Sequence, residues 1–110
     1  MPRFERFDVV AVPFPYVERP VAQRRPALVV LAGVGAPHDL LWVLMITAAA
    51  NPRWPEDVVI DDHAAAGLPI PSLIRTAKIA TIAATDARPL GVLPARQTSQ
   101  VEAILRRRFG

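Results

Sequence analysis

Two arginines and one threonine stand where apolar segments begin or end. Arg24 and Arg25 come directly before the apolar run that starts at Pro26, and Thr47 ends a second such run. A guanidinium stays charged and can hold two phosphate oxygens together, and a threonine hydroxyl at a strand end can hydrogen-bond another. These residue types suit phosphate chemistry. Taken by themselves, they are better explained as a surface arginine paired with a carboxylate and a threonine that satisfies backbone groups.

The two histidines, His38 and His63, offer a different chemistry. Two imidazoles can act as base and acid in a metal-free phosphodiester cleavage. Each histidine lies next to an aspartate in a predicted loop or turn, which is an ordinary surface setting. The same neighbours offer metal ligands, but no helical or short-loop spacing brings three together. We therefore expect no histidine pair at the site, no metal and no cofactor.

The composition excludes several classes of protein. The chain has no cysteine, which excludes a disulfide framework, a thiolate zinc site and a cysteine nucleophile. Its apolar runs are far shorter than the ~20 residues of a membrane-spanning helix, and Glu5 and Asp8 interrupt any N-terminal secretion signal. We expect a cytoplasmic protein with no membrane partner.

The basic residues are almost all arginine. Twelve of the thirteen are arginine and Lys78 is the sole lysine, while the net charge is only +3. Arginine suits a nucleic-acid partner because its planar fork matches phosphate. A GC-rich genome also produces an arginine-for-lysine bias with many alanines, and from composition alone that explanation is the stronger one.

The pattern of apolar residues predicts short strands rather than a helical bundle. Twelve prolines are spread over 110 residues, and each removes a backbone donor that an interior helix needs. The second and third expected strands are apolar on both faces, which indicates a closed or tightly layered sheet. The chain is long enough for one domain only. The expected strands are residues 8–12, 26–31, 40–47, 57–60, 72–75 and 78–82.

Turn and helix signals follow the fourth expected strand. Asp61 or Asp62 can cap a short turn over residues 63–66, which Gly67 ends. Near the C-terminus, Gly91 and Pro94 are expected to close the sheet region.

One amphipathic C-terminal helix is expected to pack on the sheet. Val101, Ile104 and Leu105 lie at helical spacing and form its apolar face. The run Arg106–Arg108 is expected to be a solvated helix end, where the helix dipole favours cations.

Five short motifs, in order and at matching spacing, resemble the MazF/PemK-like toxin family. Each motif is weak alone, but five in order are hard to obtain by chance, and they cover nearly the whole chain. They are Asp8-Val9-Val10 leading into Val12-Pro13-Phe14-Pro15, Arg24-Arg25-Pro26-Ala27-Leu28-Val29-Val30, Ile46-Thr47, Asp57-Val58-Val59-Ile60, and the segment from Ala65 to Thr76.

The resemblance implies a fold and a function. The fold is mainly β, an SH3-like small barrel with a C-terminal helix, formed by residues 1–110 as a single domain that is usually a homodimer. The function is that of the toxin in a type II toxin-antitoxin system, an endoribonuclease that cleaves single-stranded mRNA without a metal and so inhibits translation and growth. A cognate antitoxin, with a disordered acidic tail that folds onto the toxin, holds this activity in check.

The resemblance also implies the catalytic residues. Arg25 takes the place of the family's catalytic arginine and Thr47 that of its active-site hydroxyl residue. Two positions depart from the family pattern. Phe7 stands where relatives usually have glycine before the first strand, and Ala48 stands where some have serine. Arg25 would stabilise charge at the phosphate, and the general base is left open because arginine hardly gives up its proton.

Seven further residues are candidates for RNA binding. The aromatic ones could stack unpaired bases and the basic ones could contact phosphates. Packing at the barrel rim is an equal alternative for Tyr16 and Trp54 and the favoured one for Phe14, and structural pairing is an equal alternative for Arg75 and Lys78. The seven candidates are Arg24, Phe14, Tyr16, Arg53, Trp54, Arg75 and Lys78.

A second hypothesis has the same fold but no catalytic site. The chain would then be a non-catalytic barrel of the same shape, either a gyrase-poison-like toxin or a module that only binds protein or nucleic acid. The retention of both Arg25 and Thr47 argues against it.

Overall fold

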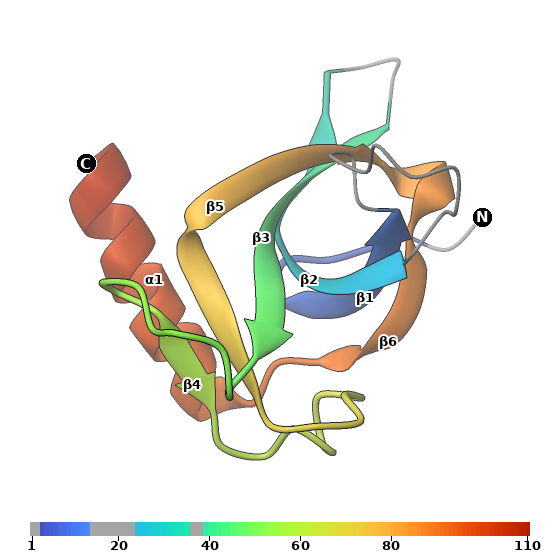
Figure 1. Ribbon diagram of the computed structural model, residues 1–110. Coiled ribbons are helices and arrows are strands. Elements are labelled where there is room, and N and C mark those ends of the chain that lie inside the picture. The colour runs from blue at the N-terminus through green and yellow to red at the C-terminus, as the bar shows by residue number, and fades with distance from the viewer. Residues whose placement is uncertain (1–2, 14–23, 36–38) are drawn as a thin grey trace.

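The computed structural model describes residues 3–13, 24–35 and 39–110. Six strands form one antiparallel sheet in the order β4-β5-β3-β2-β1-β6, which curls into a small barrel (Figure 1). The expected β-barrel with a C-terminal helix is confirmed. The elements are β1 (Asp8–Pro13), β2 (Arg24–Val34), β3 (Leu40–Ala48), β4 (Val58–Ile60), β5 (Ser72–Ala83), a 3-10 turn (Ala84–Asp86), β6 (Arg88–Val92) and α1 (Ala95–Phe109).

The middle residues of β2 and β3, 27–29 and 43–46, are buried on both faces, as their sequences predict, whereas Leu31 and Trp42 farther along the ladder are exposed. Leu28 and Leu44 are opposite each other and belong to the core cluster that includes residues of α1. Ala27 and Met45 are also opposite each other, and they belong to a second core cluster, formed by the other face of the curled sheet. This double burial explains why both strands are continuous apolar runs rather than alternating ones.

β5 is one strand of twelve residues, so the prediction of two short strands is wrong. Its pairing with β3 shifts between Leu44, which is opposite Ile79, and Met45, which is opposite Arg75. The residues between Arg75 and Ile79 form a bulge. A bulge bends a strand without ending it, and here it lets one long strand follow the curvature of the barrel.

β6 (Arg88–Val92) was not expected, because Gly91 and Pro94 were expected to close the sheet region. It pairs with β1 and is the last strand in the sheet order. Pro89 is opposite Val10, and its missing N–H is tolerated because an edge strand needs hydrogen bonds on one side only.

The loop after β4 packs tightly against β6. Asp62 caps its turn, as predicted, by accepting a hydrogen bond from the backbone N–H of Ala65 at 3.1 Å. Gly67 follows at φ +78°, and a Cβ there would collide with the carbonyl group of Leu90. The two backbones approach so closely because Gly67 has no side chain. This contact brings the loop between β4 and β5 against the last strand.

Phe7 has a backbone conformation that normally favours glycine. Its φ is +75°, its N–H donates to Val29 at 2.7 Å, and its carbonyl accepts from Leu93 at 3.0 Å. These bonds hold the chain entry to β1, which begins at Asp8 as expected. The left-handed conformation supplies a physical reason for glycine at this position in related chains.

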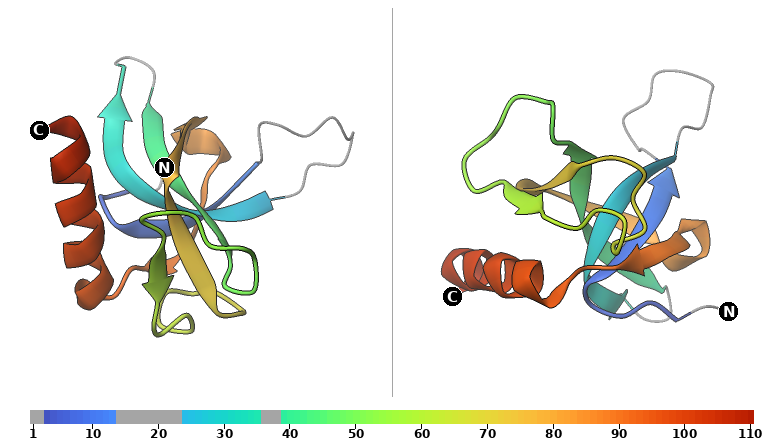
Figure 2. Two further views of the ribbon diagram at one scale, coloured as in Figure 1. Left: turned by 60° about the vertical axis from the view of Figure 1, so that its left-hand side comes forward. Right: turned by 90° about the horizontal axis from the view of Figure 1, so that it is seen from below.

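The C-terminal helix is confirmed and lies against one side of the barrel (Figure 2). Val101, Ile104 and Leu105 are buried in the core, as their spacing predicts. Gln97 is also buried, and its amide donates to Asp61 at 3.1 Å, which ties the start of the helix to the loop after β4. None of the helices in the described residues is long and apolar enough to cross a membrane.

The arginines at the helix end are exposed, as predicted, but two of them also form ion pairs. Arg107 and Arg108 donate to the carboxylate of Glu56 at 2.8 and 2.6 Å, and Arg108 also donates to the carbonyl of Thr76. The hydrogen bond from Arg107, and after it that from Arg108, holds the pKa of Glu56 below its ordinary value of 4.5. The end of the helix is thereby tied to the segment before β4.

We expect Gly67→Ala to destabilise the protein more than Gly33→Ala. Both glycines have positive φ, but a Cβ at Gly33 meets nothing within 4 Å, whereas one at Gly67 collides with the backbone of β6. The collision should add about 1–3 kcal/mol to the conformational cost that both variants share. The free energy of unfolding in urea measures the difference, and equal losses would contradict this account.

We expect Glu56→Gln to lower stability at neutral pH but not at acid pH. A carboxyl whose pKa is lowered by folding stabilises the folded state above its ordinary pKa, and the contribution disappears as pH falls through the lowered value. The stability difference between wild type and variant should therefore be full at pH 7 and shrink below the ordinary value of 4.5. Glu5→Gln, with the same change in charge, is the control. A difference independent of pH would contradict the prediction.

Candidate active site

The ladder between β2 and β3 brings Arg25 and Thr47 together. Ala27 on β2 is opposite Met45 on β3. Arg25 lies two residues before Ala27, and Thr47 lies two residues after Met45. Because the strands are antiparallel, both lie toward the same end of the ladder. In an antiparallel pair, such positions share a face of the sheet.

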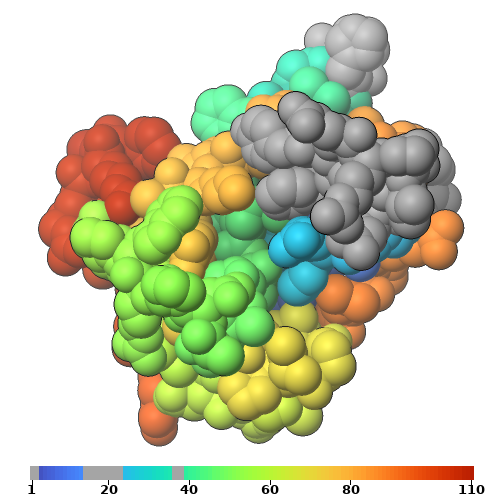
Figure 3. Space-filling model, in the orientation of Figure 1, coloured from blue at the N-terminus to red at the C-terminus, as the bar shows by residue number. Residues whose placement is uncertain are grey.

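Arg25 and Thr47 line one cavity of about 360 Å³. The start of β2, the end of β3 with its following loop, and the segment before β5 surround it, and these segments meet on one face in Figure 3, in light blue, green and yellow. The polar lining consists of Arg24, Arg25, Thr47, Asn51 and Ser72. Aliphatic side chains form the rest of the wall, among them those of Pro26, Ile46, Leu68, Pro69, Ile70 and Leu90.

Asn51 is a polar residue of this site that the sequence reasoning missed. Its side-chain amide donates to the hydroxyl oxygen of Thr47 at 2.6 Å. Its position in a loop four residues after Thr47 gave no periodic signal. The asparagine before a proline indicated only a turn.

Arg24 lies at the same cavity but is oriented by the backbone. Its guanidinium donates to the carbonyl of Asp86 at 2.7 Å and to that of Ala11 at 3.5 Å. Carbonyl groups orient a guanidinium without neutralising it, so Arg24 adds positive charge beside Arg25.

Arg75 is engaged by the loop that carries Trp54. It donates to the carbonyl of Pro52, its Nε lies 3.6 Å from the carboxylate of Asp57, and its guanidinium stacks 4.1 Å from the centre of the Trp54 ring. The side chain of Asp57 is 1% exposed, and its other contact is the backbone N–H of Trp54 at 2.9 Å. These contacts favour the structural alternative for Arg75. The guanidinium of Arg75 also covers one face of the Trp54 ring, so that face is not free to stack an RNA base.

The remaining candidates are less well placed. Arg53 and Trp54 are exposed in the loop after β3, and Lys78 is half-buried in the bulge of β5, but none of the three lines the cavity. Phe14 and Tyr16 lie outside the described residues. Their predicted contacts with RNA are untested.

No carboxylate or imidazole appears among the described residues that line the cavity. His63 lies in the turn after β4, and His38 lies outside the described part of the chain. The group that would accept a proton at this site therefore stays unassigned.

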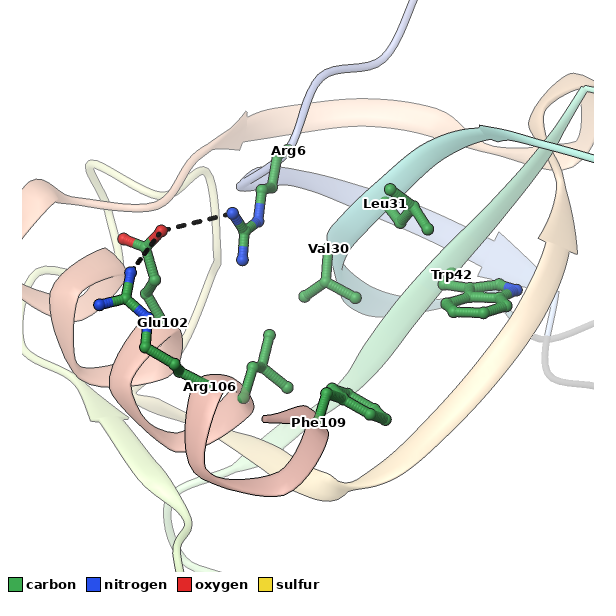
Figure 4. Close-up of a pocket in the computed structure, with 8 residues that line it drawn as sticks. Arg6, Val30, Leu31, Trp42, Glu102, Arg106 and Phe109 are labelled. Atoms are coloured by element: carbon green, nitrogen blue, oxygen red, sulfur yellow. Dashed lines mark hydrogen bonds and ion pairs between the residues drawn. The ribbon is translucent and has the colours of Figure 1, made fainter.

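A second, apolar groove lies away from this cavity, between α1 and the sheet (Figure 4). It has a volume of about 420 Å³, and Leu31, Trp42 and Phe109 are exposed beside it. At its polar side, Glu102 lies 3.4 Å from Arg6 and 3.9 Å from Arg106.

Comparison with known proteins decides the family. Residues 5–109 match the family model described as PemK-like, MazF-like toxin of type II toxin-antitoxin system. The chain belongs to this family. The curated proteins contain no match.

Solved structures of MazF toxins have the same fold as this PemK/MazF-like chain. The Mycobacterium tuberculosis toxin MazF-mt6 is 24% identical, with a TM-score of 0.65 over 87% of this chain and 89% of that one. MazF from Deinococcus radiodurans is 21% identical, with a TM-score of 0.69 over 94% of this chain and 93% of that one. The SH3-like barrel expected from the sequence is therefore confirmed.

Proposed function

We propose that this toxin is an endoribonuclease that cleaves single-stranded mRNA without a metal. The observation that carries the proposal is the shared cavity of Arg25 and Thr47 in a chain of the PemK/MazF-like family. These are the two residues to which the sequence resemblance assigned catalysis, and they come from separate strands.

The chemistry requires charge at the phosphate. The ribose 2′-oxygen forms a bond to the adjacent phosphorus while the bond to the 5′-oxygen breaks, leaving a cyclic phosphate and a 5′-hydroxyl. Negative charge grows on the phosphoryl oxygens in between, and fixed donors that meet it provide most of the stabilisation in such reactions. In the proposed mechanism the guanidinium of Arg25 holds those oxygens, and the hydroxyl of Thr47 donates to one of them.

Two proton transfers accompany these bond changes. The 2′-hydroxyl loses a proton, and the 5′-oxygen gains one as it leaves. Arg25 suits the second transfer: a guanidinium hardly gives up its proton to water, but the departing 5′-oxygen becomes a far stronger base as its bond to phosphorus breaks. The first acceptor is either water or a group outside the described lining of the cavity.

Loss of Arg25 tests this proposal. Arg25→Ala should reduce the rate of cleavage of a long unstructured RNA by roughly 10²–10³-fold, the usual effect of removing one such donor. Arg96→Ala, which removes an exposed arginine at the start of the helix, is the matched control. Cleavage by wild type should persist in EDTA.

Three outcomes would overturn the proposal. They are a folded wild type that leaves the RNA intact, an Arg25→Ala variant as fast as wild type, and an activity that EDTA abolishes. Growth arrest with intact RNA and inhibited gyrase would favour the non-catalytic alternative.

We also propose that two copies of the toxin pair through the apolar groove beside α1. Leu31 is opposite Trp42, which is opposite Thr81 on β5. Ile79, two residues from Thr81, is exposed as well, so the apolar surface extends onto β5. The charges at its polar side have both signs, which suits an interface formed by two identical surfaces.

The other expected partner, an antitoxin with an acidic tail, would complement the basic cavity.

Trp42→Glu should convert the dimer to a monomer. Two carboxylates would be placed in an apolar interface, where an unpaired charge is costly. Light scattering after size-exclusion chromatography gives the mass, and Val92→Glu, at an exposed apolar residue of β6, is the control. A monomeric wild type, or a Trp42→Glu variant that remains dimeric, would contradict the pairing through this surface.

A further inference from the structure

The contact between Asn51 and Thr47 determines what the threonine hydroxyl can do. A hydroxyl has one proton to donate and two lone pairs that accept. The Asn51 amide donates to the Thr47 oxygen at 2.6 Å and so occupies one of those lone pairs. The hydroxyl proton remains available for a different partner.

We propose that Asn51 is a positioning residue that fixes the Thr47 hydroxyl as a hydrogen-bond donor to a phosphate oxygen. The inference rests on the proposed function, because it needs a phosphate in the cavity that Arg25, Thr47 and Asn51 line. A phosphate oxygen only accepts, so a hydroxyl that presents a lone pair to it would repel it. Asn51 selects the useful orientation before the substrate arrives.

The backbone around Asn51 holds this amide in place. The backbone N–H of Asn51 donates to the carbonyl of Ala48 at 3.0 Å, and the backbone N–H of Ala49 donates to the carbonyl of Pro71 at 2.9 Å. The first bond forms a tight turn directly after β3. The second ties the turn to the segment before β5, which forms another side of the same cavity.

Arg75 holds the other end of the same loop. It donates to the carbonyl of Pro52, the residue directly after Asn51, and stacks on Trp54. The carboxylate of Asp57 completes the arrangement, because it faces Arg75 and accepts from the N–H of Trp54. A loop fixed on both sides of Asn51 leaves the amide little freedom to turn away. Arg75 thus supports the site through Asn51.

A double-mutant cycle separates positioning from general stability. Asn51→Ala should lower kcat for RNA cleavage by about 10-fold or more with a smaller change in KM, since the oriented donor matters most when charge develops on the phosphate. Thr47→Val removes the hydroxyl and keeps the shape. In that background Asn51→Ala should cause no further loss, because a residue that acts through another has no effect once the other is gone.

Asn51→Asp gives the converse result. A carboxylate of nearly the same shape accepts the hydroxyl proton, which turns the Thr47 lone pairs toward the substrate and adds a negative charge beside the phosphate. This variant should be slower than Asn51→Ala although it perturbs packing less. Gln100→Ala, which removes an exposed amide from α1, is the control and should leave kcat unchanged.

The outcomes distinguish this inference from the proposed function. A folded wild type that does not cleave RNA would overturn the proposed function and the inference with it. A wild type that cleaves, together with an Asn51→Ala variant of equal kcat, would overturn the inference alone. Additive losses in the cycle, or an Asn51→Asp variant faster than Asn51→Ala, would do the same. Thermal unfolding of each variant verifies that it is folded.

Discussion

The burial of β2 and β3 on both faces is the constraint on which the rest of the molecule depends. In a sheet with one wet face, a shift of one residue in the pairing exposes half the core and buries polar groups. In the middle of this ladder, at residues 27–29 and 43–46, both faces are core, so a shift there disturbs packing on both sides at once. The pairing of Ala27 with Met45 is therefore firmly fixed. The buried middle leaves no room for polar side chains, and Arg25 and Thr47 lie just beyond it, where they share one cavity.

The loops around this cavity are held by close backbone contacts, and Ala66 and Leu68 of the loop before β5 are also buried in the main core. The segment before β5 packs on β6 through Gly67, and the loop after β3 is held by the carbonyl groups of Ala48, Pro52 and Pro71. Such contacts are short-ranged and specific, so each loop has little freedom to move toward or away from the strands. The site thereby gains the rigidity that positioning of a substrate requires.

The sequence predicted the strands that burial defines and missed the elements that tertiary pairing defines. Residues 26–31 and 40–47 were identified because a doubly buried strand is apolar throughout. The bulge of β5 left no trace in the pattern, because the residues on its two sides look like separate strands. β6 was missed because Gly91 and Pro94 indicated the end of the sheet, whereas residues 88–92 form a strand by pairing with the edge of β1. Local propensity cannot report such a partner.

The same distinction holds for the site. Arg25 and Thr47 were predicted through the resemblance, and the ladder explains how residues 22 positions apart come together. The sequence did not indicate Asn51, since its place in the site depends on one hydrogen bond, to Thr47, across a loop. Arg75 could not be assigned either way, because neither its charge nor its place in the chain reveals Asp57 and Trp54 as its neighbours.

The partners of the arginines show how residues of one type can differ in function. Arg75 faces the carboxylate of Asp57, which neutralises it and makes it a structural support. Arg24, another residue that lines the cavity, is held by the carbonyls of Asp86 and Ala11, which orient its guanidinium without neutralising it. In the proposed reaction a second charge near Arg25 would lower the cost of a doubly negative phosphorane, because attraction between a fixed cation and a growing anion needs no reorganisation. In the proposed reaction a weak proton acceptor is then sufficient, since the arginines stabilise the charge that deprotonation of the 2′-hydroxyl creates.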